Sequence, residues 1–255
     1  MRKALVFCSA LLVVVAPAVL AEGLDLTWRA CNADPGRTSA AVLDCAAPGG
    51  STIDLFGCFQ IAATQDSFIG MDCVLNLGVE DPNGPPLEDF WHFDGGACND
   101  LANGSAVLSI ARPETLCSGA ASPWNSQTQS AMAYRIDSPC RGHFYLSIDR
   151  ETPLKLLANT NFLAFRITFS TDRAVENGTG QCTGCSYPGV LIWTSATLGN
   201  IRGGGQAYLV SGPGLVSNCP TFNNSSYSWC STDCFDCPLV PVRNRTWGQL
   251  KSLYR

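Results

Sequence analysis

The 255-residue chain has few of the side chains from which most catalytic and metal sites are built. It contains two histidines, and only 15% of its residues are charged. It has no Gly-x-Ser-x-Gly, His-Glu-x-x-His, phosphate-loop or EF-hand pattern, so the familiar serine-hydrolase, zinc-protease, nucleotide and calcium sites are not indicated. We therefore predict a non-catalytic protein without a cofactor or a bound metal.

Long apolar runs are also scarce, and the one that is present lies at the N-terminus. Residues 1–21 combine a basic start with an apolar stretch and with small residues at Val19 and Ala21, the −3 and −1 positions of a cleavage site. This pattern predicts a signal peptide and a secreted, surface or periplasmic protein that begins at Glu22. The short run and Pro17 disfavour an uncleaved anchor. No later segment approaches the roughly 20 apolar residues of a membrane span, so we expect no transmembrane segment after signal removal.

Charge is unevenly distributed along the chain. Residues 22–242 carry 21 acidic and 10 basic side chains, a net charge of −11, whereas residues 243–255 carry four basic and no acidic ones. An acidic body does not suit the phosphate backbone of nucleic acids. Nucleic acid is therefore not an expected partner, and the cationic end needs a separate explanation.

Alternation of apolar and polar residues predicts a series of short strands. They are Leu24–Trp28, Ile53–Ile61, Ile69–Val79, Ala106–Ile110, His143–Asp149, Phe162–Ser170, Val190–Leu198 and Gln206–Ser211. Frequent turn residues and the lack of a convincing amphipathic helix predict one all-β domain over 22–212, an antiparallel β-sandwich or jelly roll. An irregular Cys/Pro-rich segment (213–242) and a basic aromatic tail (243–255) follow.

Two local arrangements are expected within this domain. The strands at 162–170 and 190–198 are predicted to form a central hairpin, whose connecting loop contains Cys182-Thr-Gly-Cys185. Pro153–Ala158, after the strand that starts at His143, resembles a single helical turn.

The 14 cysteines, 13 of them after residue 21, predict disulfides in an exported protein. Neighbouring cysteines are the simplest partners, and the expected bridges are Cys31–Cys45, Cys98–Cys117, Cys182–Cys185 and, if a bulge at Gly57 turns one side chain over, Cys58–Cys73. The remaining cysteines (Cys140, Cys219, Cys230, Cys234, Cys237) have no assigned partner. A zinc site from the Cys182/Cys185 and Cys234/Cys237 pairs is the alternative, but 48 residues separate them, where compact ribbons use roughly 15–20.

Glu88–Asp94 is the densest aromatic cluster of the chain, with Phe90, Trp91 and Phe93 among acidic residues and His92. Exposed rings beside carboxylates would suit a sugar, so a carbohydrate-binding or carbohydrate-cleaving module is the alternative function. Rings that plug one end of a sandwich are the second interpretation, and we favour it.

The C-terminal segment carries the most specific motif. It reads Arg243-Asn-Arg-Thr-Trp-Gly-Gln-Leu-Lys-Ser-Leu-Tyr-Arg255. After the basic residues Arg243 and Arg245, three apolar residues would share one face of a helix: Trp247, Leu250 and Tyr254. The tail could dock on its own acidic body, stay disordered, or be recognised by a sorting or anchoring partner. The Pro-containing stretch before it favours the third option.

This tail resembles that of an uncharacterised family of secreted, cysteine-containing bacterial β-proteins that end in Arg-Asn-x-Thr-Trp-Gly-x-x-Lys-x-Leu-Tyr-Arg. Leu24-x-Leu-x-Trp28 and Cys182-x-Gly-Cys185 are similar as well, whereas Cys58, Cys73, Cys140, Cys230 and Cys234 depart from the family pattern. The resemblance implies bacterial origin and export, and it brings no known activity. Together these features predict an exported, non-catalytic surface or matrix protein that binds a partner or serves a structural role.

Overall fold

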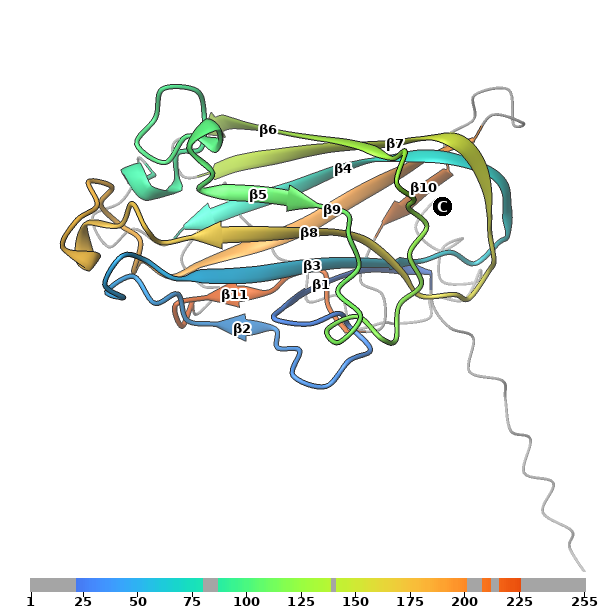
Figure 1. Ribbon diagram of the computed structural model, residues 1–255, viewed down its shortest axis with the longest axis horizontal. Coiled ribbons are helices and arrows are strands. Elements are labelled where there is room, and N and C mark those ends of the chain that lie inside the picture. The colour runs from blue at the N-terminus through green and yellow to red at the C-terminus, as the bar shows by residue number, and fades with distance from the viewer. Residues whose placement is uncertain (1–21, 80–86, 139–140, 201–207, 212–215, 226–255) are drawn as a thin grey trace, which may run out of the picture.

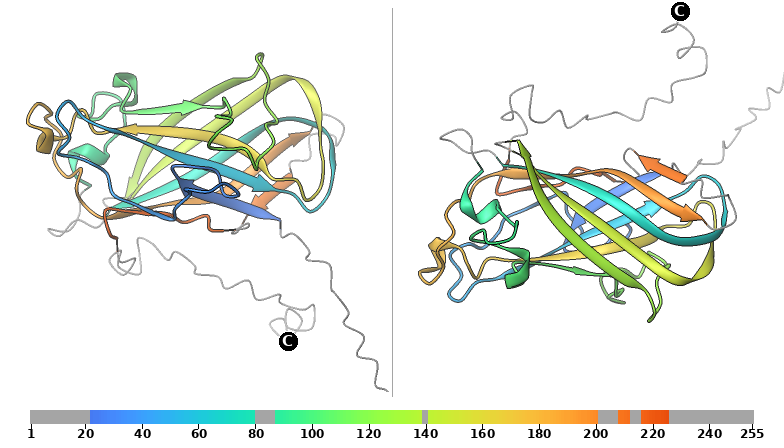
Figure 2. Two further views of the ribbon diagram at one scale, coloured as in Figure 1. Left: turned by 60° about the horizontal axis from the view of Figure 1, so that its bottom comes forward. Right: turned by 90° about the horizontal axis from the view of Figure 1, so that it is seen from above.

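The chain folds into two β-sheets that pack face to face (Figures 1 and 2). The computed structural model describes residues 22–79, 87–138, 141–200, 208–211 and 216–225. The predicted all-β class, with disulfide bridges, is confirmed. No helix within the described ranges is long and apolar enough to cross a membrane.

The smaller sheet has four antiparallel strands in the order β1-β3-β8-β5. Their bounds are β1 (Gly23–Trp28), β3 (Thr52–Gln60), β8 (Phe162–Ser170) and β5 (Ala106–Ser109). The register of β3 against β8 shifts between Gly57 and Cys58, which is the bulge expected at Gly57. A Cβ atom at Gly57 would overlap the ring of Phe165 on the neighbouring strand, so the bulge needs a glycine.

The larger sheet has seven strands, with the path β2-β11-β9-β4-β7-β6 and β10 also paired to β9. Their bounds are β2 (Ala40–Ala41), β11 (Thr221–Phe222), β9 (Gly189–Asn200), β4 (Gln65–Val79), β7 (Arg141–Leu156), β6 (Gln129–Ser138) and β10 (Tyr208–Ser211). Only the short β2–β11 pair is parallel. Phe222 of β11 is fully buried in the core, so the sandwich extends beyond the boundary at residue 212.

The core lies between the inner faces of the two sheets. The inward residues alternate along each strand, as Leu75 and Leu77 on β4 and Phe165 and Ile167 on β8 illustrate, and all four are 0% exposed. This period-2 burial is what a strand with one apolar face requires. It explains why the strands with the clearest alternation were predictable.

The outer face of the smaller sheet is covered by the loop that connects β5 to β6, which crosses in front of that sheet in Figure 1. A second apolar cluster lies beneath this loop and contains Phe56, Cys58 and Leu163 with Cys117 and Ala120. Both faces of β3 are therefore buried along its second half.

The predicted central hairpin is wrong. β8 and β9 are both strands, but β8 lies in the smaller sheet and β9 in the larger one. Consecutive strands β3 and β4 are divided between the sheets in the same way. The predicted helical turn at Pro153–Ala158 is also wrong, because β7 continues to Leu156, which is fully buried.

Candidate functional site

The aromatic segment Glu88–Asp94 closes one end of the sandwich. Phe90, Trp91 and Phe93 are each 1% exposed. Trp91 stacks on Phe222 with a centroid distance of 4.4 Å, and its indole Nε1 donates to the carbonyl of Gly184 at 2.8 Å. The plug interpretation is therefore confirmed. The predicted platform of exposed rings is wrong, because buried rings offer no face on which a sugar could stack.

The acidic and basic groups of the same segment make local contacts. Glu88 accepts a hydrogen bond from the Thr183 hydroxyl at 2.7 Å, and His92 Nε2 lies 2.8 Å from the Leu87 carbonyl oxygen. Glu88 and His92 flank the short 3-10 helix η1 (Asp89–Trp91). Glu88 thus attaches the plug to the loop that carries Thr183, and His92 bonds within its own segment.

The six cysteines predicted to form local bridges are all bridged, but with different partners. The disulfides join Cys31 to Cys117, Cys45 to Cys185 and Cys98 to Cys182. The predicted pairs Cys31–Cys45, Cys98–Cys117 and Cys182–Cys185 are therefore wrong. The reason is that loops far apart in sequence meet in the fold. Four of the cysteines come together in the loops around the aromatic plug, whereas Cys31 and Cys117 meet beneath the loop on the outer face of the smaller sheet. A zinc site at Cys182 and Cys185 is also excluded, because both sulfurs are oxidised.

The predicted Cys58–Cys73 bridge is wrong as well, since both cysteines are free and buried. Cys58 lies under the loop on the outer side of β3, whereas Cys73 lies in the core between the sheets. Burial raises the pKa of the Cys58 thiol from its usual 9.0 to about 12, and it also raises the pKa of the Cys73 thiol well above its usual value. Cys219, for which the sequence predicted no particular partner, is disulfide-bonded.

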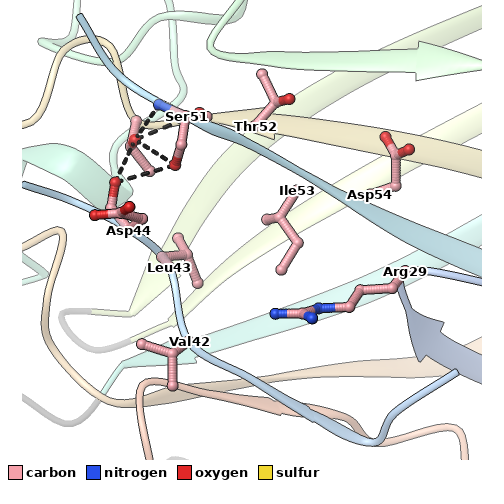
Figure 3. A pocket seen from close by; sticks show the side chains of 9 residues that line it. Arg29, Val42, Leu43, Asp44, Ser51, Thr52, Ile53 and Asp54 are labelled. Carbon is pink, nitrogen blue, oxygen red and sulfur yellow. Dashed lines mark hydrogen bonds between the residues drawn. The ribbon is translucent and has the colours of Figure 1, made fainter. Parts of the chain in front are cut away.

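A hollow of about 340 Å³ lies beside the first half of β3 (Figure 3). This volume is near the lower end of the range for small-ligand sites, about 300–1,000 Å³. Nine residues from four separate stretches line it: Arg29, Val42, Leu43, Asp44, Ser51, Thr52, Ile53, Asp54 and Thr171. None of them was a candidate site residue in the sequence.

Hydroxyl groups fix one wall of the hollow. Thr171 Oγ1 donates to the Asp44 carbonyl at 2.9 Å and accepts from the Ser51 N–H at 2.8 Å. Ser51 Oγ donates to the same Asp44 carbonyl at 3.0 Å. These bonds, drawn as dashes in Figure 3, tie the segment after β2 to the start of β3, so the hollow has a defined shape at this end.

Arg29 supplies the positive charge of the hollow. It is exposed, its side chain extends toward Val42 (Figure 3), and its guanidinium makes no hydrogen bond or ion pair with any residue that the structure describes. Its φ of 71° is left-handed, which costs an L-residue with a Cβ roughly 1–2 kcal/mol. An arginine is thus held where glycine or asparagine would be less strained.

Asp54, by contrast, is already paired on the side away from the hollow. Its Oδ1 accepts from the Thr168 hydroxyl at 2.5 Å, and its Oδ2 lies 3.6 Å from Arg166 Nη1. The negative charge of Asp54 is therefore largely compensated on β8. Arg29 remains the group in the hollow that would gain most from a charged partner.

Comparison with known proteins adds no family. Neither family models, nor curated proteins, nor solved structures give a match to this chain. The site therefore has to be interpreted from its own geometry. The five predicted tail residues (Arg243, Arg245, Trp247, Leu250, Tyr254) lie outside the described residues.

Proposed function

We propose that this chain is an exported, non-catalytic protein of a cell surface or matrix, which binds a partner or serves a structural role there. The observation that carries the proposal is the long-range clamp formed by its disulfides. Cys45–Cys185 and Cys98–Cys182 span 140 and 84 residues, and such bridges persist in oxidising, non-cytoplasmic compartments. They brace the loops at one end of the sandwich against each other and around the buried aromatic plug.

The braced end also favours binding over catalysis. Its acidic residue Glu88 bonds to the neighbouring loop at Thr183, its histidine His92 bonds to the Leu87 carbonyl, and its cysteines Cys182 and Cys185 are oxidised. A rigid scaffold with fixed loops is a common support for a recognition surface. The acidic charge of the body and the basic tail fit a protein that is attached to its final location by its C-terminus.

We further propose that a sorting or anchoring partner recognises the tail through the face of Trp247, Leu250 and Tyr254. A short amphipathic helix that places such residues in a groove is a recurring recognition mode. The basic residues Arg243 and Arg245 would add electrostatic attraction, which is screened within about 10 Å at ordinary salt. The resemblance of this segment to other secreted tails supports the proposal.

Truncation after Val242 tests the role of the tail. We expect the truncated protein to keep its disulfides, Cys31–Cys117, Cys45–Cys185 and Cys98–Cys182 among them, and its melting temperature, but to lose its final location. A full-length variant with Trp247→Ala, Leu250→Ala and Tyr254→Ala should mislocalise in the same way, whereas Lys251→Ala should not. A markedly lower melting temperature of the truncated protein would instead show that the tail docks on the body, and the sorting proposal would fail.

A further inference from the structure

The backbone of β3 has an open edge where the hollow lies. β1 pairs with β3 only as far as Trp28 opposite Leu55. Both backbone groups of Trp28 then bond to Thr38, at 2.9 and 3.2 Å, and the left-handed Arg29 turns the chain away. The first residues of β3 therefore lack a neighbouring strand on this side.

The ladder on the other side of β3 identifies which groups are open. Thr171 N–H donates to the Ser51 carbonyl at 2.9 Å, and Ile53 lies opposite Phe169 of β8. Because successive residues of a strand direct their backbone groups to opposite sides, Thr52 and Asp54 direct theirs to the hollow. Arg29 N–H donates a hydrogen bond to the Asp54 carbonyl at 2.8 Å. Among the described residues, Asp54 N–H and both backbone groups of Thr52 have no hydrogen-bond partner.

The open groups are the N–H and C=O of Thr52 and the N–H of Asp54, two residues further along. An added strand pairs with backbone groups in this arrangement. We propose that the hollow binds a short extended peptide of a partner protein, which adds to the edge of β3 at Thr52–Asp54 and places an acidic side chain against Arg29. The proposal rests on the proposed binding function and names its partner class. A carboxylate can accept two parallel hydrogen bonds from one guanidinium, and Arg29 has this capacity free.

Two further features favour a peptide over other anionic ligands. Val42, which is 59% exposed, and the half-buried Ile53 offer apolar contacts to the side chains that flank the acidic residue. None of the nine lining residues is aromatic, so a sugar ring would find no ring on which to stack. The basic tail (residues 243–255) carries four basic side chains and no acidic one, so it is electrostatically unsuited to dock against Arg29.

The test is a titration of the full mature protein, labelled with 15N, with the peptide acetyl-Thr-Val-Glu-Val-Thr-amide. We expect chemical-shift changes at the amides of Thr52 and Asp54 and slower hydrogen exchange of both. The peptide with glutamine in place of glutamate should bind about tenfold more weakly, since a charge-assisted bond is lost. A peptide methylated on every backbone nitrogen, which cannot donate to the Thr52 carbonyl, should also bind at least about tenfold more weakly.

Matched variants assign the charge to Arg29. Arg29→Gln should remove the preference for glutamate over glutamine. Arg135→Gln, which removes the same charge from an exposed position on β6 at the far edge of the larger sheet, should keep it. Thr52→Pro removes an open N–H without touching the ladder to β8, and it should weaken both peptides.

Several outcomes would overturn the inference. They are the absence of shift changes at about 10 mM peptide, where a millimolar dissociation constant would be visible, or equal binding of both peptides by the wild type. Arg29-dependent binding of trigalacturonate without peptide binding would assign the hollow to acidic sugars instead. None of these results depends on localisation, so failure here is distinguishable from failure of the tail experiment.

Discussion

Removal of the Cys45–Cys185 disulfide measures how strongly the loop clamp stabilises the fold. With Cys31–Cys117 and Cys98–Cys182 still in place, the two cysteines are joined in the unfolded chain by a circuit of about 36 residues, from Cys45 to Cys31, from Cys117 to Cys98 and from Cys182 to Cys185. The chain-entropy relation gives about 13 cal/mol/K for closing such a loop, or about 4 kcal/mol at 25 °C. A local Cys182–Cys185 bridge would contribute less than half of this by the same relation.

The assay is urea unfolding of the oxidised proteins at 25 °C. The variant with Cys45→Ala and Cys185→Ala should lose about 4 kcal/mol of unfolding free energy. The variant with Cys98→Ala and Cys182→Ala should lose a similar amount, because it opens the same circuit. Removal of both bridges should cost about 8 kcal/mol, since with Cys31–Cys117 still in place the last bridge closes a loop of about 82–84 residues.

The reasoning is refuted if either double variant loses less than about 1 kcal/mol, or if both variants together lose no more than one alone. A further control is the variant with Cys182→Ala and Cys185→Ala, which breaks both long bridges at once. It should be as unstable as the protein without any of the four cysteines. Were Cys182 and Cys185 bonded to each other, this variant would be the mildest of the set.

Three other perturbations have defined outcomes. Phe93→Ala should lower the free energy of unfolding by about 3–5 kcal/mol in urea melts, because it leaves a cavity among rings that include Phe144 at 5.2 Å; a loss below about 1 kcal/mol would show that the plug is not packed. Arg29→Gly should raise the free energy of unfolding by up to about 1 kcal/mol, since glycine relieves the left-handed strain, and a loss of stability would contradict that account. Cys58 should resist iodoacetamide in the folded protein. Burial raises the pKa of its thiol from the usual 9.0 to about 12. The stability that the buried, protonated thiol contributes is therefore complete below pH 9 and is lost as the pH rises toward 12. Cys58→Ala should flatten that part of the curve of unfolding free energy against pH, and an unchanged curve would contradict the burial.

The strands were predictable where one face is fully apolar. β1, β4, β8 and β9 follow the alternation read from the sequence closely, because their inner residues enter a single core. β6 was not predicted, since it is an edge strand on which Tyr134 is buried while Met132 and Ile136 remain half-buried. The burial signal weakens there, as it does on most edge strands.

Strand pairing and disulfide pairing were not predictable, and for a common reason. Reasoning from the sequence joins neighbours, which placed β8 and β9 in a hairpin and Cys182 next to Cys185. In the structure each apolar strand is buried by packing its inner face against the opposite sheet, and connections that cross between sheets bring distant loops together. Which loops meet depends on the whole topology, and no local pattern records it.

The hollow left no trace in the sequence for a similar reason. In the sequence, Arg29 follows a predicted strand and looks like any exposed basic residue. Its left-handed φ of 71° occurs in the turn after Trp28, whose backbone bonds to Thr38, and no sequence pattern predicts this turn. The open backbone groups of Thr52 and Asp54 depend on where β1 stops pairing. The positive φ of a non-glycine residue can be recognised only in a structure. Every residue has the same backbone N–H and C=O, so the sequence does not show which of them are left unpaired.

The order of the bridges along the chain has a consequence for biosynthesis. The bridges Cys31–Cys117, Cys45–Cys185 and Cys98–Cys182 each skip over intervening cysteines, and Cys98–Cys182 lies inside the span of Cys45–Cys185. A chain oxidised as it emerges from a membrane would first join nearest neighbours, such as Cys31 with Cys45 and Cys98 with Cys117, and would have to exchange these bonds afterwards. Exchange of this kind takes minutes to hours without a catalyst. Yield of the folded protein should therefore depend on a disulfide isomerase more than on an oxidase.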